Sequence, residues 1–127
     1  MNFISGNTGL MLQRSMDYLW QRQSCILDNI ANAETPGYKT KYATFEESLQ
    51  KAIQGAAQTG TSTAAIRTAI QETPVTVKQE QASTRLDENG VNVTDQMVQL
   101  AQNGYQLQYV MDAISSDFSL LRTAIKG

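Results

Sequence analysis

The chain has 127 residues, of which 17% are charged, and a formal net charge of −2. This length suits one modest domain, and a slightly acidic chain with scattered basic residues is not typical of a dedicated nucleic-acid binder. The chain has no histidine, and Cys25 is its single cysteine. An internal disulfide and a cysteine–histidine catalytic pair are therefore excluded.

The opening stretch, MNFISGNTGLML, has neither a basic segment nor a continuous apolar core, so we expect no Sec-type signal peptide. No apolar run approaches the roughly 20 residues that a helix needs to span a bilayer. If the chain leaves the cytoplasm, it must use another route.

Residues 1–34 are predicted to form an N-terminal amphipathic helix, because their apolar side chains recur in steps of four and three. The helix should end near Ala33 or Glu34, since Pro36 pushes the residue before it out of helical conformations. The residues that carry the spacing are Leu12, Met16, Leu19, Ile26, Ile30 and Ala33, with Gln23 at the missing step.

A sharp turn is expected directly after this helix. Pro36 fixes φ near −65°, and Gly37 can adopt the positive φ that a type II turn requires. Asn29 and Asn32 lie three residues apart, on one face of the last helical turn. Their amides can hold either the unpaired carbonyls of the helix end or the backbone of an incoming loop. An ordinary helix end followed by a loop is the alternative.

Residues 35–92 are predicted to form a polar, partly irregular middle segment. The stretch 54–73 is rich in Ala, Thr, Gln and Gly and is interpreted as a flexible loop or a weak helix. The alternation in residues 74–80, PVTVKQE, predicts a short strand. Residues 87–90, DENG, are a turn signal.

Residues 93–127 are predicted to form a long C-terminal helix with a coiled-coil-like contact face. Thr94 is the candidate N-cap, followed by Asp95 in the first turn. Gly104 interrupts the apolar row, either as a tolerated defect or as a point where a neighbouring backbone approaches closely. The row consists of Val93, Met97, Leu100, Gly104, Leu107, Met111, Ile114, Phe118, Leu121 and Ile125.

The expected fold is therefore mainly α, with two long amphipathic helices that form a coiled-coil-like hairpin within a single domain, 1–127. Beside the C-terminal row lies a second partial stripe, and a face this wide suggests two or more neighbours. The apolar stripes exceed what one intramolecular contact needs, which points to assembly with other chains. The seam that we expect to be buried between subunits is Leu107, Met111, Ile114, Phe118, Leu121 and Ile125.

Two stretches resemble the axial proteins of the bacterial flagellar rod and hook family. The first is NIANAETPGYK, residues 29–39, which matches the signature that follows the first helix in that family. The matching residues are Asn29, Ala31, Asn32, Thr35, Pro36, Gly37 and Tyr38. The second stretch, residues 85–125, resembles the C-terminal helix region of the proximal-rod branch. Its matching residues are Arg85, Asp87, Asn89, Phe118, Ser119, Leu121 and Arg122.

The resemblance covers about two-thirds of the chain and implies a structural building block rather than a catalyst. It implies export in an unfolded state through the flagellar type III apparatus, without a cleaved signal peptide, and assembly into the periplasmic rod of the basal body. The implied partners are copies of the chain, other rod proteins, and ring and adaptor proteins at the rod base. Phe45 and Leu49, four apart in FEESL, resemble an export-gate motif, and a plain amphipathic turn is the alternative.

Catalysis is not expected. No metal-ligand cluster, phosphate loop or catalytic triad is visible in the sequence, so no cofactor, nucleic acid or small-molecule substrate is predicted. The alternative function is that of a small helical adaptor or chaperone of a secretion system. A discrete folded dimer in dilute solution would favour the adaptor, and a loosely folded monomer that polymerises would favour the rod subunit.

Overall fold

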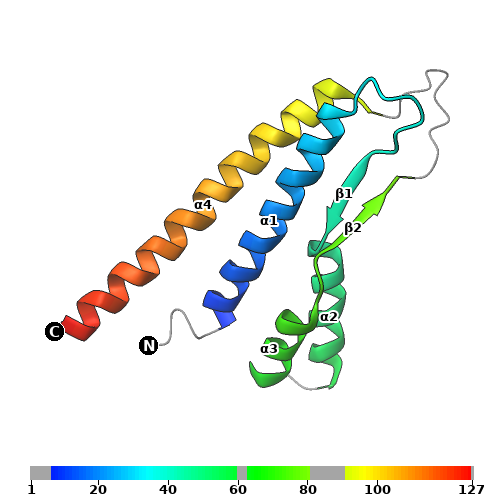
Figure 1. Ribbon diagram of the computed structural model, residues 1–127. Helices are drawn as coiled ribbons and strands as arrows, with labels where there is room; N and C mark the ends of the chain where they lie inside the picture. The colour runs from blue at the N-terminus through cyan, green and yellow to red at the C-terminus, as the bar shows by residue number, and fades with distance from the viewer. Residues whose placement is uncertain (1–6, 60–62, 81–90, 127) are drawn as a thin grey trace.

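The computed structural model describes residues 7–59, 63–80 and 91–126. The fold is mainly helical, as predicted, with two long helices packed against each other and a smaller middle unit (Figure 1). The elements are α1 (Asn7–Ala31), β1 (Lys41–Thr44), α2 (Glu46–Thr59), α3 (Thr63–Glu72), β2 (Thr76–Gln79) and α4 (Val93–Lys126).

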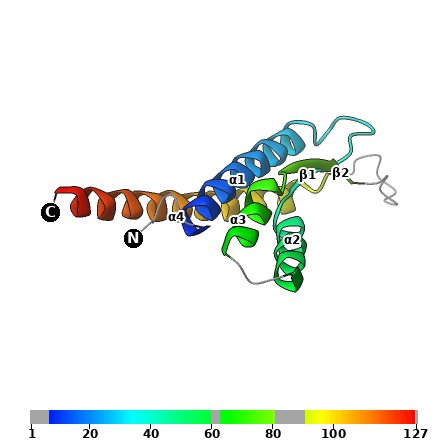
Figure 2. The same ribbon diagram turned by 90° about the horizontal axis from the view of Figure 1, so that it is seen from below.

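Helix α1 is the central element of the arrangement. It packs against α4 on one side and against β1 and α3 on the other (Figure 1). The C-terminal end of α4 extends beyond the first described residues of α1 in both views (Figures 1 and 2). None of the described helices is long and apolar enough to cross a membrane.

The core consists of two apolar clusters that meet at Tyr18. The first joins α1 to α4 through Leu19, Leu107 and Val110, each at most 7% exposed. The second joins α1 to the middle unit and is built on buried Phe45, Leu49 and Ile70. Tyr18 is a partly buried member of both clusters, so α1 holds the two halves of the molecule together.

The first helix ends at Ala31, slightly earlier than predicted. The amide of Asn32 still donates to the carbonyl of Asp28 at 3.0 Å, but the amide of Ala33 bonds to Ile30 at 3.2 Å. The helix therefore tightens to a three-residue spacing in its last turn, which is common where a helix leads into a sharp turn.

Within residues 54–73, the described stretches 54–59 and 63–72 are helical, so the helix interpretation holds there and the loop interpretation is wrong. Large apolar residues are few, but Leu49 on α2 and Ile66 and Ile70 on α3 give each helix one apolar side. These sides pack against α1. The guanidinium of Arg14 also donates to the carbonyl oxygen of Thr73, at the end of α3.

The predicted strand within residues 74–80 is confirmed as β2, which pairs antiparallel with β1. The register places Lys41 opposite Gln79 and Thr44 opposite Thr76. The two threonine hydroxyl oxygens lie 2.6 Å apart. The predicted DENG turn, residues 87–90, lies outside the described residues, as do Arg85, Asp87 and Asn89.

Helix α4 begins at Val93 as predicted, but its N-cap is Asn92 rather than Thr94. The Asn92 side-chain oxygen accepts a hydrogen bond from the amide of Asp95 at 3.1 Å, the usual geometry of an N-cap. Asp95 occupies the first turn, where its charge favours the helix dipole.

We predict that Leu19→Ala lowers the free energy of unfolding by about 2–4 kcal/mol, because it opens a cavity in the α1–α4 cluster. The matched control is Leu27→Ala on the same helix, since Leu27 is 48% exposed and should cost about 0.5 kcal/mol or less. Chemical denaturation of both variants measures the difference. Equal losses would mean that the two helices do not pack through Leu19.

Candidate functional site

The turn after α1 has the predicted type II geometry. Gly37 has a φ of 73°, and the amide of Tyr38 donates to the carbonyl of Thr35 at 3.2 Å. A Cβ built on Gly37 meets nothing within 4 Å. Glycine is favoured here by the backbone conformation and not by a lack of space. Pro36 and Gly37 are exposed, so their contribution is to reverse the chain.

Asn29 joins three elements through one buried amide. Its side-chain nitrogen donates to the Lys41 carbonyl at 2.8 Å and to the Gln96 side-chain oxygen at 2.9 Å. Its side-chain oxygen accepts a hydrogen bond from the Lys41 amide at 2.8 Å. The residue is 1% exposed. The amide therefore ties the end of α1 to the start of β1 and to the first turns of α4.

Asn32 acts locally instead. Its side-chain nitrogen donates to the carbonyl of Asp28 at 2.9 Å, and its oxygen accepts from the Thr35 hydroxyl at 3.2 Å. Asn32 thus holds a carbonyl of the helix end, whereas Asn29 holds the incoming backbone. Each of the two interpretations proposed from the sequence applies to one of the asparagines. Ala31 is the exposed last residue of α1.

The contact between α1 and α4 contains a second buried amide, which the sequence reasoning missed. Asn103 is fully buried. Its side-chain nitrogen donates to the Leu19 carbonyl at 3.0 Å and to the Gln23 side-chain oxygen at 2.8 Å. Its side-chain oxygen is buried without a partner among the described residues. The signal was present, because Gln96 and Asn103 are spaced by seven residues, but polar residues were not counted as part of a contact face.

Helix α4 carries two neighbouring rows of residues, one at the contact with α1 and one facing away from it. The row at the α1 contact includes Gln96, Asn103, Val110 and Leu107, all buried. We call the other row the outer stripe. Its first three residues each follow Gln96, Asn103 or Val110 by one position, and the row repeats every seven residues. Four of its members are 50–77% exposed, and the fifth, a glycine, is also exposed. The outer stripe consists of Met97, Gly104, Met111, Phe118 and Ile125.

The structure divides the predicted assembly seam between these rows. Leu107 is buried within the chain, where it contacts the cluster on α1. Ile114 and Leu121 are half-buried, and Ile114 packs against the same cluster. The remaining members of the seam belong to the outer stripe and are exposed: Met111, Phe118 and Ile125.

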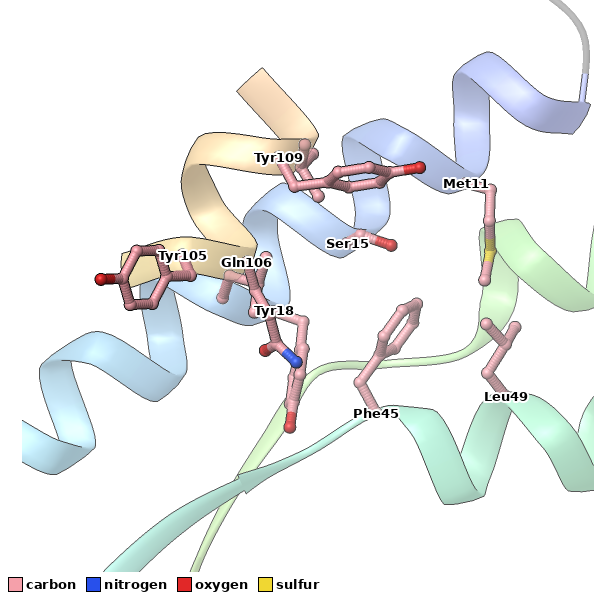
Figure 3. A pocket seen from close by; sticks show the side chains of 10 residues that line it. Met11, Ser15, Tyr18, Phe45, Leu49, Tyr105, Gln106 and Tyr109 are labelled. Carbon is pink, nitrogen blue, oxygen red and sulfur yellow. The ribbon is translucent and has the colours of Figure 1, made fainter. Parts of the chain in front are cut away.

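An apolar groove of about 490 Å³ lies where α1, α4 and the start of α2 meet (Figure 3). Phe45 and Leu49, the predicted export-gate pair, lie in this groove and are 2% and 3% exposed. The Phe45 ring lies 5.8 Å from the Tyr18 ring, and the Arg14 guanidinium lies 5.4 Å from its centre. Figure 3 shows both side chains among Met11 and Tyr18. In the folded chain, this pair is a packing element.

The described residues include no group of three or more His, Cys, Asp or Glu side chains that could hold a metal ion. Cys25 is buried, and burial, with a smaller contribution from the charge of Asp28, raises the pKa of its thiol. Both effects disfavour the thiolate, which is the reactive form of cysteine. A helical hairpin with a bare apolar stripe is typical of a subunit that assembles through its helices.

Comparison with curated proteins shows which family this chain resembles. The flagellar basal body rod protein FlgB of Escherichia coli (strain K12) is 30% identical over 124 residues, which span 91% of this chain and 90% of that protein. FlgB of Bacillus subtilis is 28% identical over 114 residues, 84% of this chain and 83% of that protein. FlgB of Borrelia hermsii is 49% identical over 43 residues, 34% of this chain and 32% of that protein. No family model matches the chain.

The chain belongs to the family of flagellar basal body rod proteins FlgB. It is a structural protein of the flagellar basal-body rod and not an enzyme. This membership decides against the secretion adaptor that the sequence left open, and it implies assembly with other flagellar rod proteins.

We predict that Asn29→Ala lowers the free energy of unfolding by about 2–4 kcal/mol, because it leaves the Lys41 backbone groups and the Gln96 side chain without their partner. Asn32→Ala is the matched control and should cost about 1 kcal/mol or less, since its bonds are local and partly exposed to water. Thermal and urea unfolding of the two variants measure this. If both variants lost the same stability, the amide of Asn29 would not join the three elements.

Proposed function

We propose that this chain is a subunit of the proximal part of the flagellar rod and acts there as one axial domain, 1–127. Its proposed sections are an N-terminal helix in 1–34, a middle segment in 35–92 and a C-terminal helix in 93–127. The observation that carries the proposal is the outer stripe of α4, which repeats every seven residues and is exposed in the single chain. A stripe of this period is typical of a helix that packs along another helix.

The contact surfaces of α1 and α4 are unequal. Helix α1 covers the side of α4 that contains Gln96, Asn103, Leu107 and Val110, together with half-buried Ile114. Apolar surface on the outer stripe stays in water, and its burial would contribute about 25 cal/mol per Å². A subunit that joins a helical assembly can bury this surface against several neighbours at once. We therefore propose copies of this chain and other rod proteins as its partners, with ring and adaptor proteins at the rod base.

We further propose that the chain reaches the rod in an unfolded state through the flagellar type III export apparatus. Phe45 and Leu49 would then be the residues that the apparatus recognises. Their burial in the folded chain supports this order of events, because side chains that are 2–3% exposed can be contacted only before folding. The motif residues 29–38 act later, since they position β1 against α1 in the folded subunit.

Ile125→Asp tests the assembly proposal. Ile125 is 77% exposed, so a charge there should change the stability of the single chain by about 0.5 kcal/mol or less. In an assembled rod the same carboxylate would be desolvated without a partner, and rods should not form. The measurement is the recovery of basal bodies and swimming in cells that lack their own copy of this protein.

Thr123→Asp is the control for that variant, because Thr123 is exposed and lies off the outer stripe on the same last turns. Both carboxylates meet the helix dipole in the same unfavourable way. Normal rods built from the Ile125→Asp chain would remove the outer stripe from the interface. Ile114→Asp is a less selective probe, since Ile114 also packs against the α1–α4 cluster.

The export proposal is tested by replacing Phe45 and Leu49 with alanine together. We expect the variant to stay in the cytoplasm, because the recognised side chains are missing. Ile70→Ala is the matched control, since Ile70 lies in the same buried cluster but outside the motif. The control should destabilise the fold by about 2–4 kcal/mol and still be secreted. Equal secretion of both variants would leave the pair with a packing role alone.

A further inference from the structure

The middle unit, formed by β1, α2, α3 and β2, packs on the rest of the molecule mainly through α1. Strand β1 and helix α3 contact that helix, whereas α4 faces Phe45 and Leu49 across the apolar groove (Figure 3). The side chains that α1 supplies to the second cluster, Leu10, Met11 and Tyr18, are partly buried. The apolar contact that holds the middle unit in place is therefore incomplete.

Arg14 on α1 makes a polar contact with the middle unit at the end of α3. Its guanidinium donates to the carbonyl oxygen of Thr73 and lies 5.4 Å from the centre of the Phe45 ring. Helix α3 ends at Glu72 and has no basic residue in its last turn, so Arg14 supplies the positive charge that favours a helix C-terminus. A cation over an aromatic ring adds to the attraction. The ion pair of Arg14 with Asp17, which is 65% exposed, contributes little by comparison.

Asn29 holds the middle unit at the start of β1. Its amide bonds both backbone groups of Lys41 and lies about 22 Å from Arg14 along α1, at about 1.5 Å per residue. Asn29 is 1% exposed, whereas the side chain of Arg14 is 22% exposed. Water reaches the Arg14 contact more easily, so we expect this end of the unit to open before the Asn29 end.

We infer that Arg14 masks the proposed export motif, because it holds α2 and α3 against α1 and can release them while α1 and α4 stay paired. This inference rests on the proposed function and names how access to Phe45 and Leu49 is controlled. Helices α2 and α3 have 14 and 10 residues, and helices this short are marginal in water without a packing partner. Once released from α1 they unfold locally, and the motif becomes accessible.

The pair of long helices has contacts of its own that survive this opening. Its cluster is built on Leu19, Leu107 and Val110, and the buried amide of Asn103 adds two hydrogen bonds to α1. None of these side chains belongs to the second cluster, and the two clusters share Tyr18. Local opening of α2 and α3 therefore removes one neighbour of Tyr18 and leaves the rest of the helix pair intact. The motif is hidden by folding of the middle unit and not by pairing of the long helices.

The test compares Arg14→Met with Arg22→Met in the full-length protein by hydrogen exchange of backbone amides, read by mass spectrometry. Arg22 is the matched control, because it lies on the same helix and its guanidinium donates to the Gln106 side-chain oxygen of α4 at 3.2 Å. In Arg14→Met the amides of α2 and α3 should exchange about tenfold faster or more, since a charge-assisted hydrogen bond and a ring contact are lost. The amides of α4 around Leu107 and Val110 should not change. Arg22→Met should leave α2 and α3 as they are.

Three results would overturn the inference. The first is equal exchange in α2, α3 and the buried part of α4 in the unchanged protein, because the chain then opens as one unit. The second is an Arg14→Met chain in which α2 and α3 exchange no faster than in Arg22→Met. Arg14→Lys covers the case in which Arg14→Met does not fold, because lysine keeps the charge and loses the forked geometry. It should give a smaller acceleration in α2 and α3, and the third contrary result is acceleration along its whole chain.

Secretion of the same variants separates this inference from the proposed function. A motif that opens more often should raise the fraction of Arg14→Met that is exported after a short pulse of synthesis. If that fraction does not rise, while joint replacement of Phe45 and Leu49 by alanine blocks export, the proposed function holds and the masking is wrong. If the joint alanine variant is exported normally and α2 and α3 of Arg14→Met still exchange faster, recognition of the pair is wrong, and Arg14 still holds the middle unit.

Discussion

The arrangement depends on a single buried amide. Asn29 donates to Lys41 and Gln96 and accepts from Lys41 in return, so α1, β1 and α4 meet at one side chain. A carboxylate could only accept and an ammonium could only donate, and neither could satisfy both backbone groups of Lys41. The turn at Pro36 and Gly37 serves this contact, because it returns the chain so that β1 begins beside the helix it has just left.

The same use of amides shapes the contact between the long helices. Asn103 and Gln96 occupy positions where apolar residues would bind α1 more tightly, and hydrogen bonds take the place of part of the apolar burial. Polar groups inside a helix pair define one register and orientation at some loss of stability. The apolar residues Met97 and Met111, one position after Gln96 and Val110, lie instead on the exposed outer stripe. The contact within the chain is thus partly polar, and apolar surface stays exposed on α4.

Much of this was predictable from the sequence, and the exceptions have a common cause. The heptad spacing predicted α4, the Pro–Gly pair predicted the turn, and the alternation around Val77 predicted β2. Periodicity also found the row of Leu100, Leu107, Ile114 and Leu121 and the outer stripe beside it. It could not tell which side of that row α1 would cover. That choice depends on hydrogen bonds made by Gln96 and Asn103 to residues more than 60 positions away. Such partners have no local signature.

The middle unit was underestimated for a related reason. Composition alone makes residues 54–73 look unable to fold, since large apolar residues are rare there. Their placement matters more than their number, because Ile66 and Ile70 pack with Phe45, Leu49 and α1. Only the tertiary contact makes two weak helices stable. Local propensity was also too coarse to choose among Asn92, Thr94 and their neighbours for the cap of α4.

The proposed export in an unfolded state and the proposed assembly make opposing demands on the chain, and the distribution of contacts fits both. Its internal contacts must be weak enough to open, and a helix pair with amides in its seam and an unpaired Asn103 oxygen meets that need. In the proposed assembly, burial of the outer stripe would add stability that the single chain lacks, so the folded form would be favoured where neighbours are present. The stability of the subunit is then linked to assembly in the way that ligand binding stabilises a native state. Apolar residues at positions 96 and 103 would strengthen the internal seam and make the folded single chain less dependent on its neighbours.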